Sequence, residues 1–513
     1  MVRIENWTSP RFSKGAWRLT KFAAFGALAT FTLAVATVLW AQSQATDPGV
    51  RGVAWCVGCV NGIGTCSAGL SGLNNCFQTG LTTNEKESEP AVVTQFTTTA
   101  VVGCQPSGSN VTACGLGPRF NSNSCASCHQ QPVLGGSSPS SNPLFDVYQS
   151  DGTDSFSNTM PFFETTGGPI LIPRLPPSSG GTGLVQQLFT ISGMSYPNCK
   201  IQQPDFSNEP GLVYRQPLPT FGDGYIDFVE NKDILNNLNS NLTLKASLGI
   251  GGSANMADDG SVSRFGWKAQ WRAVLPAVGA EEQVEEGITN EMLLTELDQT
   301  AECDVNLVPE DPTNYSMNGS SNTPWYFLAD AERDAIFVRF LATPVPSTAS
   351  TQNGGVGAGP GCPDQFNNGQ SCVNGQAQFN SIGCVLCHTT SYRTPPGSIP
   401  SQGHTLLNLY SDLLLHHMGN CLADNITQGL AQGDMWRTPP LWNLGQRIWF
   451  MHDGRTKDLV TAIEDHADPV VPCPGAYPAS EANAVVNAFS GLANMSGVDG
   501  TAQQDLVNFL RTL

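Results

Sequence analysis

Two copies of the pattern Cys-x-x-Cys-His constrain this chain more than any other feature of its sequence. One lies in the stretch NSNSCASCHQQP and the other in GCVLCHTT. A Cys-x-x-Cys pair alone also suits a redox dithiol, half of a zinc site or a disulfide, but the adjoining histidine makes it the attachment signature of c-type haem. The two thiols can add to the vinyl groups of one porphyrin, and the histidine can bind its iron. The pattern predicts two covalently bound haem c groups, with thiols from Cys125, Cys128, Cys384 and Cys387 and iron ligands from His129 and His388.

The amino-terminal segment has the layout of an export signal. An apolar run occupies residues 22–40, Ser43 and Ala45 follow it, and five basic residues precede it: Arg3, Arg11, Lys14, Arg18 and Lys21. We predict a signal peptide over residues 1–45, cleaved after Ala45, and a periplasmic or otherwise exported protein. The run is also long enough to span a bilayer, so an uncleaved membrane anchor is the alternative. The polar segment that follows lacks stop-transfer charges and favours cleavage.

The acidic balance of the chain excludes some partners. The sequence holds 24 basic and 43 acidic residues, and the predicted signal peptide contains five of the former and one of the latter, which leaves a formal charge of −23. Such a surface repels nucleic acid, and the sequence has neither a Walker loop nor a Rossmann fingerprint. A basic redox protein is a compatible electron donor or acceptor.

The cysteines beyond the two motifs indicate disulfides. Twelve remain, an even number, and in an exported protein they predict up to six disulfide bonds whose pairing the sequence leaves open. One further Cys-x-x-Cys pair is followed by Val60 and not by histidine, so a disulfide is the favoured interpretation there. The twelve are Cys56, Cys59, Cys66, Cys76, Cys104, Cys114, Cys199, Cys303, Cys362, Cys372, Cys421 and Cys473.

The spacing of the motifs predicts two domains. His129 and His388 are 259 positions apart, more than a single small haem c domain spans. A stretch rich in Pro, Gly, Ser and Thr, residues 342–363, marks the boundary between the two. We predict a Cys-rich region over 46–114, a first haem domain over 115–345 and a second haem domain over 346–513.

The expected fold class is mainly α with long loops, built from two cytochrome c-like haem domains. The clearest helix is at the carboxyl terminus, where Thr501 is a candidate N-cap and an apolar stripe follows at helical spacing, made by Leu506, Phe509, Leu510 and Leu513. Clusters of Gly, Pro and Asn interrupt the periodicity of the first haem domain and predict long loops there.

The sixth coordination position of each iron decides whether a haem only transfers electrons or also binds a substrate. The histidines outside the two motifs all follow the second motif: His404, His416, His417, His452 and His466. The first iron is therefore left open, uses Met160 or Met194, or takes a histidine from the other domain.

One of these histidines has the spacing of a haem ligand. Thr456 can cap a short helix on which Leu459, Ile463 and His466 share one face. An apolar face that carries a histidine can aim it at a buried haem. A histidine that is simply satisfied near a helix end, just before Pro469, fits the same spacing equally well.

Several stretches of the chain resemble a known family. Bacterial di-haem cytochrome c peroxidases and the methylamine dehydrogenase maturation enzyme have a segment similar to TPPLWNLGQRIWFMHDGRTKDLVTAI. The di-haem oxidoreductase family of peroxidases, also called thiol oxidoreductases, is the closer likeness. It matches that stretch together with DPGVRG, GLGPRFNSNSCASCHQQPVLGGSSP, RFGWKAQ and LYSDLLLHHMG, in the family's order from residue 47 to the carboxyl terminus.

The resemblance implies ligands for the second haem. His466 stands where the peroxidases place a distal methionine and the maturation enzyme a tyrosine, which implies a low-spin haem held by His388 and His466. His452 occupies the His-Asp-Gly position, which in the relatives lies near the haem and not on the iron. His416 is a tentative rival ligand for either haem, because the family retains a histidine there.

This chain also departs from the family. The peroxidases have a movable histidine soon after the first motif, whereas Gln130 and Gln131 stand here, which implies a first haem constitutively open to peroxide. The cysteines over 56–114 have no counterpart in the family. Three arginines are candidate partners of the haem propionates, with a solvated surface role as the alternative: Arg437, Arg447 and Arg455.

The predicted function is that of an exported di-haem c-type oxidoreductase, a peroxidase that reduces peroxide at the first haem with electrons passed through the second. The alternatives are a non-enzymatic di-haem electron-transfer protein and an oxidase or oxygenase of an organic substrate. The acid-base residue stays undecided among Gln130, Gln131 and Glu164. No motif supports a calcium ion.

Overall fold

Glycine and proline limit the length of the helices and strands in this chain. The sequence has 53 glycines and 35 prolines, and both residues interrupt regular elements. The longest helix in the described part of the chain, α11, has 12 residues, and strands there have two or three. The computed structural model describes residues 45–49, 77–78, 81–102, 115–148, 157–193, 196–313, 327–343, 369–397 and 399–513.

Several predicted features lie outside the described residues. They are residues 1–44 of the predicted signal peptide, most of the boundary stretch 342–363, Met194 and seven cysteines: Cys56, Cys59, Cys66, Cys76, Cys104, Cys114 and Cys362. Helices formed by the described residues all fall short of the length and apolar character needed to cross a bilayer.

Four of the described cysteines form disulfides. Cys199 is bonded to Cys303, and Cys421 is bonded to Cys473. Cys372 is a buried free thiol. The prediction of disulfides is therefore confirmed for four of the twelve cysteines.

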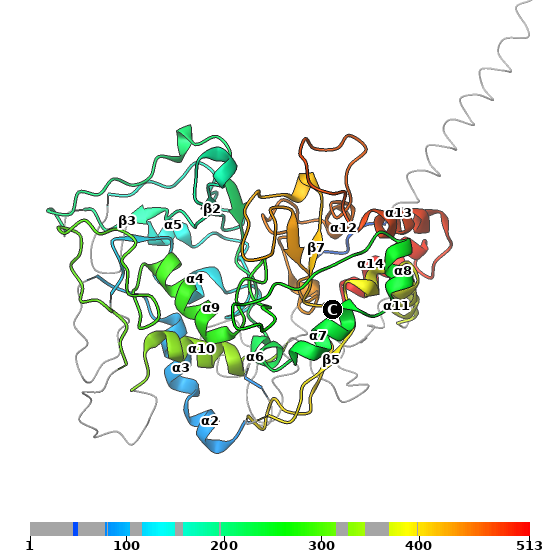
Figure 1. The fold of residues 1–513 in the computed structure, drawn as a ribbon, viewed down its shortest axis with the longest axis horizontal. Helices are drawn as coiled ribbons and strands as arrows, with labels where there is room; N and C mark the ends of the chain where they lie inside the picture. The colour runs from blue at the N-terminus through cyan, green and yellow to red at the C-terminus, as the bar shows by residue number, and fades with distance from the viewer. Residues whose placement is uncertain are drawn as a thin grey trace, which may run out of the picture. The chain divides into compact units, whose positions relative to one another are not determined.

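The elements of the first half of the chain are short (Figure 1). Its helices are α2 (Thr83–Glu87), α3 (Glu89–Thr97), α4 (Cys125–Cys128), α5 (Leu144–Val147), η3 (Pro177–Ser179), η4 (Phe206–Asn208), α6 (Asp223–Asp227), α7 (Asn231–Leu238), α8 (Leu242–Ser247), α9 (Val274–Glu281), the π-helix η5 (Glu282–Glu286) and α10 (Asp330–Phe340). Its strands are β1 (Arg119–Phe120), β2 (Ile172–Arg174), β3 (Phe189–Thr190) and β4 (Val213–Arg215).

The helices and strands of the second half are also short. Its helices are α11 (Gln370–Ser381), η7 (Cys384–Leu386), η8 (Asn420–Leu422), η9 (Leu444–Gln446), α12 (Leu459–Glu464), α13 (Asn483–Gly491), η10 (Leu492–Asn494) and α14 (Ala502–Leu510). Its strands are β5 (Tyr392–Arg393), β6 (Leu406–Leu407), β7 (Leu415–His417) and β8 (Met435–Arg437).

The strands pair into small antiparallel sheets. In the described part of the chain these are β1 with β3, β2 with β4, β5 with β6, and β7 with β8. In the last pair, His416 lies opposite Trp436. Each sheet ties together the two ends of an irregular segment that lies between its strands, which helps to hold that segment in place.

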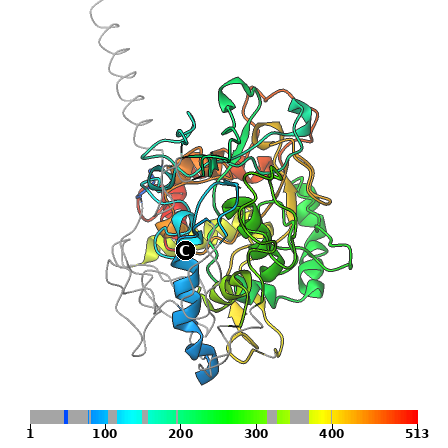
Figure 2. The same cartoon turned by 90° about the vertical axis from the view of Figure 1, so that its left-hand side faces the viewer.

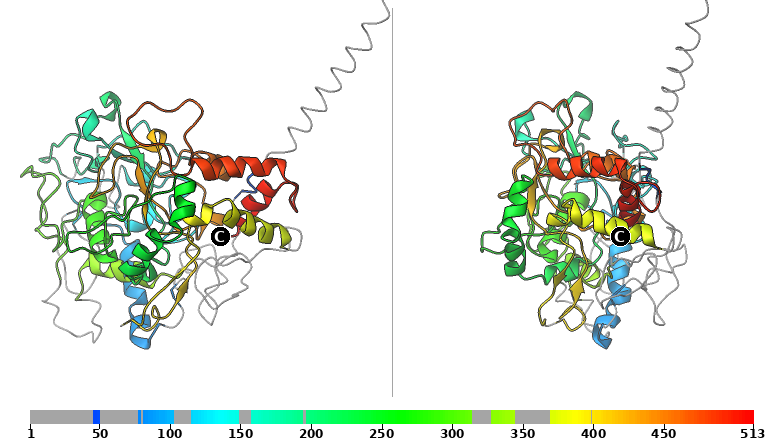
Figure 3. Two further views of the ribbon diagram at one scale, coloured as in Figure 1. Left: turned by 45° about the vertical axis from the view of Figure 1, so that its right-hand side comes forward. Right: turned by 90° about the vertical axis from the view of Figure 1, so that its right-hand side faces the viewer.

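The helices gather near the two Cys-x-x-Cys-His motifs. Helix α10 packs against α3 and α9, and α3 packs against α4, which contains the first motif (Figure 2). Helices α11 and α14 pack against each other, α13 contacts α14, and η7 of the second motif follows α11 (Figure 3). Each motif is thus supported by its own group of helices.

The main apolar core joins both halves of the chain. It contains Phe337 and Phe340 from α10 together with Phe379, Phe489 and Phe509 from the helices around the second motif. A separate core is formed by residues of the first half alone, between Ala100 and Cys303. The predicted division at residue 345 stays a prediction, and the packing across it is extensive.

The carboxyl-terminal helix follows the predicted pattern. Thr501 accepts a hydrogen bond from the amide of Gln504, as an N-cap does, and the predicted stripe is buried. Helix α11 approaches α14 closely at Gly375, where a Cβ atom would lie 2.0 Å from the carbonyl oxygen of Asp505. Glycine is required there because any side chain would separate the two helices.

The fold class agrees with the prediction in part. Helices and long loops are present, but the two-stranded sheets were not predicted. Strands of two or three residues are too short to produce a recognisable alternation of apolar and polar residues. The description of the two halves as cytochrome c-like domains stays a prediction.

Candidate functional site

The second Cys-x-x-Cys-His motif lies on the wall of a buried cavity. The amide of His388 donates to the carbonyl of Cys384 at 2.9 Å, and this turn brings Cys384, Cys387 and His388 to the same wall. The rest of the lining is mostly apolar, with side chains such as Phe379, Leu441 and Val486, so the cavity offers a porphyrin ring apolar contacts beside the two thiols and the histidine that would hold it.

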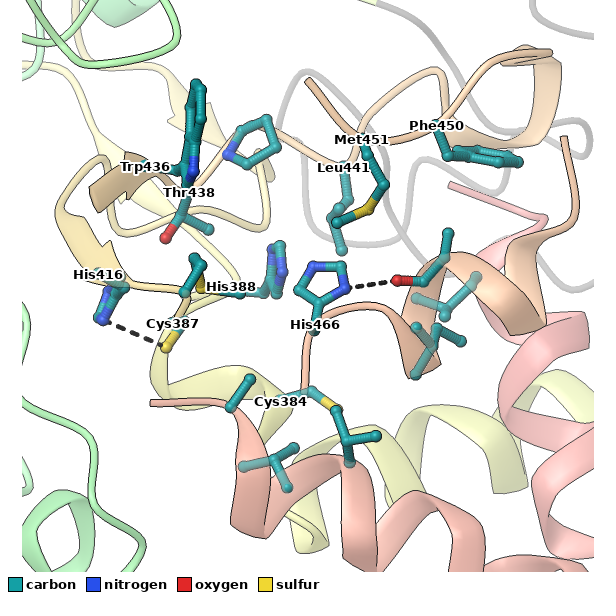
Figure 4. Close-up of a pocket in the computed structure, with 18 of the residues that line it drawn as sticks. Cys384, Cys387, His388, His416, Trp436, Thr438, Leu441, Phe450, Met451 and His466 are labelled. Carbon is teal, nitrogen blue, oxygen red and sulfur yellow. Dashed lines mark hydrogen bonds between the residues drawn. The ribbon is translucent and has the colours of Figure 1, made fainter. Parts of the chain in front are cut away.

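Two histidines line this cavity with matching hydrogen bonds. His388 Nδ1 lies 3.0 Å from the carbonyl oxygen of Tyr410, and His466 Nδ1 lies 2.6 Å from that of Ala462. A carbonyl only accepts, so each bond places the proton on Nδ1 and leaves the lone pair on Nε2, the arrangement typical of metal-ligating histidines. Figure 4 shows both rings near the centre of the cavity. Burial lowers the pKa of His388 to about 4 and also lowers the pKa of His466, which favours the neutral form that binds iron.

Helix α12 places His466 at the cavity. The N-cap of this helix is Asp458, whose carboxylate accepts from the amide of Thr461 at 2.7 Å. The predicted cap, Thr456, lies two residues too early, because its hydroxyl accepts from the amide of Asp458 at 3.0 Å and so forms the turn before the helix. His466 follows the last turn of α12, so the helix directs it into the cavity.

His416 lines the same cavity, but carboxylates bind both of its ring nitrogens. Nε2 lies 2.9 Å from Asp412 Oδ2, and Nδ1 lies 2.7 Å from Glu481 Oε2. Burial lowers the pKa of His416, but the charges and hydrogen bonds of Cys387 and Asp412 outweigh it and raise the pKa well above its ordinary value. An imidazolium with both nitrogens donating has no lone pair to offer an iron. His416 is also absent from the lining of the other cavity.

His416 belongs to a group that would suit a different metal. Ligand atoms of Cys387, Asp412 and His416 lie within 4.8 Å of one another, the one group of this kind in the searched, described part of the chain. A metal ion there would need Cys387 as a thiolate. Haem attachment would use the same sulfur as a thioether, so the two occupants exclude each other.

His452 forms part of the cavity wall. Its ring stacks on Trp436 with centroids 3.9 Å apart, and the ammonium of Lys268 lies 4.1 Å from the centroid of the same indole. Lys268 is paired with Asp424 at 3.0 Å, and both side chains are fully buried. The stack fixes His452 beside the site that His388 and His466 face.

The first Cys-x-x-Cys-His motif lines a second cavity. Helix α4 holds the two cysteines, and His129 Nδ1 lies 3.1 Å from the carbonyl oxygen of Gly136. Burial lowers the pKa of His129 by more than the carbonyls of Gly136 and Leu218 raise it. His129 therefore has the same protonated Nδ1 and neutral ring as His388.

Buried carboxyl groups line the first cavity, although no sequence motif marks them. The π-helix η5 contributes Glu282, Glu285 and Glu286. Glu286 Oε1 lies 3.4 Å from Cys125 Sγ, and Asp334 Oδ2 lies 3.7 Å from the same sulfur. Burial raises the pKa of Glu286 to about 7 and that of Glu285 to about 8. The stretch AEEQVEEG does repeat acidic pairs every four residues, but such runs usually mark solvated helix faces.

The other side chains considered as iron ligands or acid-base residues of the first haem lie elsewhere. Among the described residues that line this cavity, His129 is the one histidine, and methionine is absent. Met160 packs against the core of the first half. Gln131 donates to the carbonyl of Gln446, and Glu164 is held by Asn142 and the amide of Leu171 outside this lining.

The two cavities share one wall, whose residues line both: Trp267, Arg437, Pro439 and Arg447. Arg437 Nε donates to the carbonyl of Gly266 at 2.9 Å, and Arg447 Nε to that of Trp449 at 3.1 Å. Groups bound in the two cavities would therefore lie next to each other, with only this wall between them.

Neither arginine of the shared wall has a described carboxylate within ion-pair distance, although Asp223 and Asp412 interact electrostatically with Arg437. Each arginine is at most 8% exposed. Arg447 Nη2 has no hydrogen-bond partner. Burial lowers the pKa of both guanidinium groups to about 10, so they stay charged at neutral pH. A buried, unpaired cation calls for an anion, and the carboxylates of haem fit that need.

The third candidate arginine is different. Arg455 Nη2 lies 2.7 Å from Asp453 Oδ2, and the arginine side chain is 34% exposed. This pair leaves no charge for a ligand. The structure thus separates Arg437 and Arg447 from Arg455, three residues that the sequence treats alike.

Comparisons with known proteins identify a family for one part of the chain. A chain of hydrazine synthase from Kuenenia stuttgartiensis, in a structure pressurized with 20 bar xenon, is 16% identical, with a TM-score of 0.20. The similarity covers 37% of this chain and about half, 55%, of that one. No curated protein matches the chain. Residues 361–493 match the family described as "Di-haem oxidoreductase, putative peroxidase". The resemblance to the di-haem oxidoreductase family is thus confirmed over the segment that contains the second motif, Arg437, Arg447 and His466.

Proposed function

We propose that this chain is an exported di-haem c-type oxidoreductase that reduces peroxide in the first cavity with electrons that enter through the second. The difference between the cavities carries the proposal. His388 and His466 both line the second cavity with Nδ1 bonded to a carbonyl, so their Nε2 atoms would hold one iron there, whereas His129 is the one described histidine of the first cavity. An iron with both axial positions filled exchanges electrons but leaves peroxide no place to bind.

Each motif would hold its haem by the two cysteines and the adjoining histidine. Bound haem supplies one-electron redox chemistry and, at a free axial position, a binding place for peroxide. Arg437 and Arg447 would neutralise the haem carboxylates at the shared wall. The wall also sets the two redox groups beside each other, which favours electron transfer between them.

The buried carboxyl groups of the first cavity have a role in this reaction. Reduction of one hydrogen peroxide to two waters consumes two electrons and two protons. Glu286 titrates near neutral pH because burial raises its pKa to about 7, which is the range where a general acid is most effective. We assign proton supply to Glu286 and the adjacent Asp334.

Export rests on two observations. The amino-terminal sequence has the layout of a signal peptide, and four cysteines pair as disulfides, which persist in oxidising compartments. A soluble redox protein is then the expected electron donor, and the acidic surface suits a basic one.

A single-turnover experiment tests the proposed function. Haem-loaded protein is fully reduced without oxygen and mixed with one equivalent of hydrogen peroxide. Both haems are expected to be oxidised, two electrons per peroxide, with water as the product, and Glu286→Gln is expected to slow this step by roughly 10²-fold or more. Unchanged ferrous haems would indicate an electron carrier, and reaction with dioxygen but not peroxide would indicate an oxidase or oxygenase.

A further inference from the structure

A short segment far from the second motif in sequence contacts α14 and, through Asp47, the first residue of α12, the helix that precedes His466. Residues 46–49, which stay in the chain after the predicted cleavage, lie against α14, where Thr46 N donates to Gln504 Oε1 at 2.7 Å. Gln504 Nε2 returns a bond to the carbonyl of Thr46 at 3.0 Å. These contacts hold the segment in one register on the carboxyl-terminal helix.

Within this segment, Asp47 forms a buried two-pronged ion pair. Arg511 donates from Nε to Oδ1 at 2.7 Å and from Nη2 to Oδ2 at 2.5 Å. The side chain of Arg511 is 1% exposed and that of Asp47 is 6% exposed. Arg511 Nη1 bonds the carbonyls of Leu444 and Arg447. The ion pair is therefore fixed to the loop that forms the wall shared by the two cavities.

The carboxylate of Asp47 also holds the first residue of α12. The amide of Leu459 donates to Asp47 Oδ2 at 2.8 Å, across 412 positions of sequence. Asp458 accepts a hydrogen bond from the amide of Thr461. The two aspartates together satisfy two of the backbone amides that have no partner within the first turn of a helix. A negative charge at this end also stabilises the helix dipole.

The other end of α12 is held as well. Ser480 Oγ donates to the carbonyl of His466, and His466 Nδ1 bonds the carbonyl of Ala462 within the helix. A helix of six residues has little rigidity of its own. Its direction, and with it the position of His466, depends on the contacts at its two ends.

We propose that Asp47 is a positioning residue for His466, which sets the distal ligand of the second haem by holding the start of α12 to Arg511. The inference rests on the proposed function, because that function assigns His466 to the iron. Ser480 fixes the carboxyl-terminal end of the helix, and Asp47 fixes the amino-terminal end. Loss of the Asp47 carboxylate frees one end of α12 and lets His466 leave the iron for part of the time.

The test compares the spin state of the second haem in Asp47→Ala, Asp47→Glu and Arg511→Lys with the unaltered protein. Low-temperature electron paramagnetic resonance of haem-loaded protein reports the spin state without any assay of activity. Asp47→Ala and Arg511→Lys are expected to lose part of the low-spin signal and gain an equal amount of high-spin signal. Asp47→Glu keeps a carboxylate and is expected to recover most of the low-spin signal.

A matched control separates positioning from general stability. Asp298→Ala removes another two-residue ion pair, Arg119 to Asp298 at 2.7 Å, which lies in the first half of the chain. It is expected to lower the thermal midpoint and leave the spin states unchanged. A fully low-spin second haem in both Asp47→Ala and Arg511→Lys would overturn the proposal, because Asp47 would then serve stability alone.

The ligand assignment is tested separately with His466→Ala. A second haem that stays low-spin in His466→Ala contradicts the proposed function, whatever Asp47→Ala shows. A second haem that turns high-spin in His466→Ala and stays low-spin in Asp47→Ala contradicts only the positioning role. Should Asp47→Ala fail to fold with haem, Arg511→Lys keeps the charge and most of the volume of the arginine and decides the question.

Discussion

Replacing His466 with alanine is expected to convert one of the two haems from low-spin to high-spin. The reason is that His388 and His466 both line the second cavity and both bond a backbone carbonyl through Nδ1, which leaves the Nε2 lone pair of each for an iron. Electronic absorption and low-temperature electron paramagnetic resonance of the haem-loaded variant measure the change. The entire low-spin signal of that haem is expected to be lost, with the other haem unchanged.

His416→Ala is the matched control for this variant. His416 lines the same cavity, but Asp412 and Glu481 bind both of its nitrogens. The low-spin signal is therefore expected to persist, with at most a small shift in its g-values. Loss of the signal in His416→Ala and its survival in His466→Ala would reverse the assignment.

Replacing Arg447 with methionine is expected to change stability in opposite directions with and without haem. In haem-free protein, Arg447 is a buried cation with one unpartnered nitrogen, so the free energy of unfolding should rise by ~1–4 kcal/mol when the charge is removed. In haem-loaded protein, the same change removes the partner of a buried haem carboxylate. The free energy of unfolding should then fall by ~3–5 kcal/mol. Urea unfolding of both forms measures the two values.

Arg455→Met is the control for Arg447→Met. Arg455 is partly exposed and already paired with Asp453, so its replacement is expected to cost ~1 kcal/mol or less in either form. Changes of the same sign in haem-free and haem-loaded Arg447→Met would show that Arg447 has no haem partner.

Local patterns in the sequence predicted the local parts of the site. Cys-x-x-Cys-His needs one turn of backbone to present its three side chains, so the sequence motif is enough to specify them. The cap of α14 at Thr501 was predicted for the same reason. The cap of α12 was placed at Thr456 and is Asp458, because both residues can accept from an amide and spacing alone does not choose between them.

Contacts between residues far apart in the sequence could not be predicted from sequence patterns. Glu481 meets His416 across 65 positions, and Asp47 meets Leu459 across 412. The first of these contacts decides that His416 is a poor iron ligand, although the family resemblance left it open. Burial, which no motif encodes, also distinguishes Arg437 and Arg447 from Arg455 and turns the acidic run of η5 into a lining of the first cavity.

Carbon monoxide binding to the fully reduced, haem-loaded protein tests the central claim most directly, namely that one iron is open and the other is closed. The gas needs a free axial position on ferrous haem, so its stoichiometry counts open sites. We expect one carbon monoxide per chain that carries two haems. No binding would mean that both irons are six-coordinate and that the protein carries electrons only, whereas two per chain would show that His466 does not close the second haem.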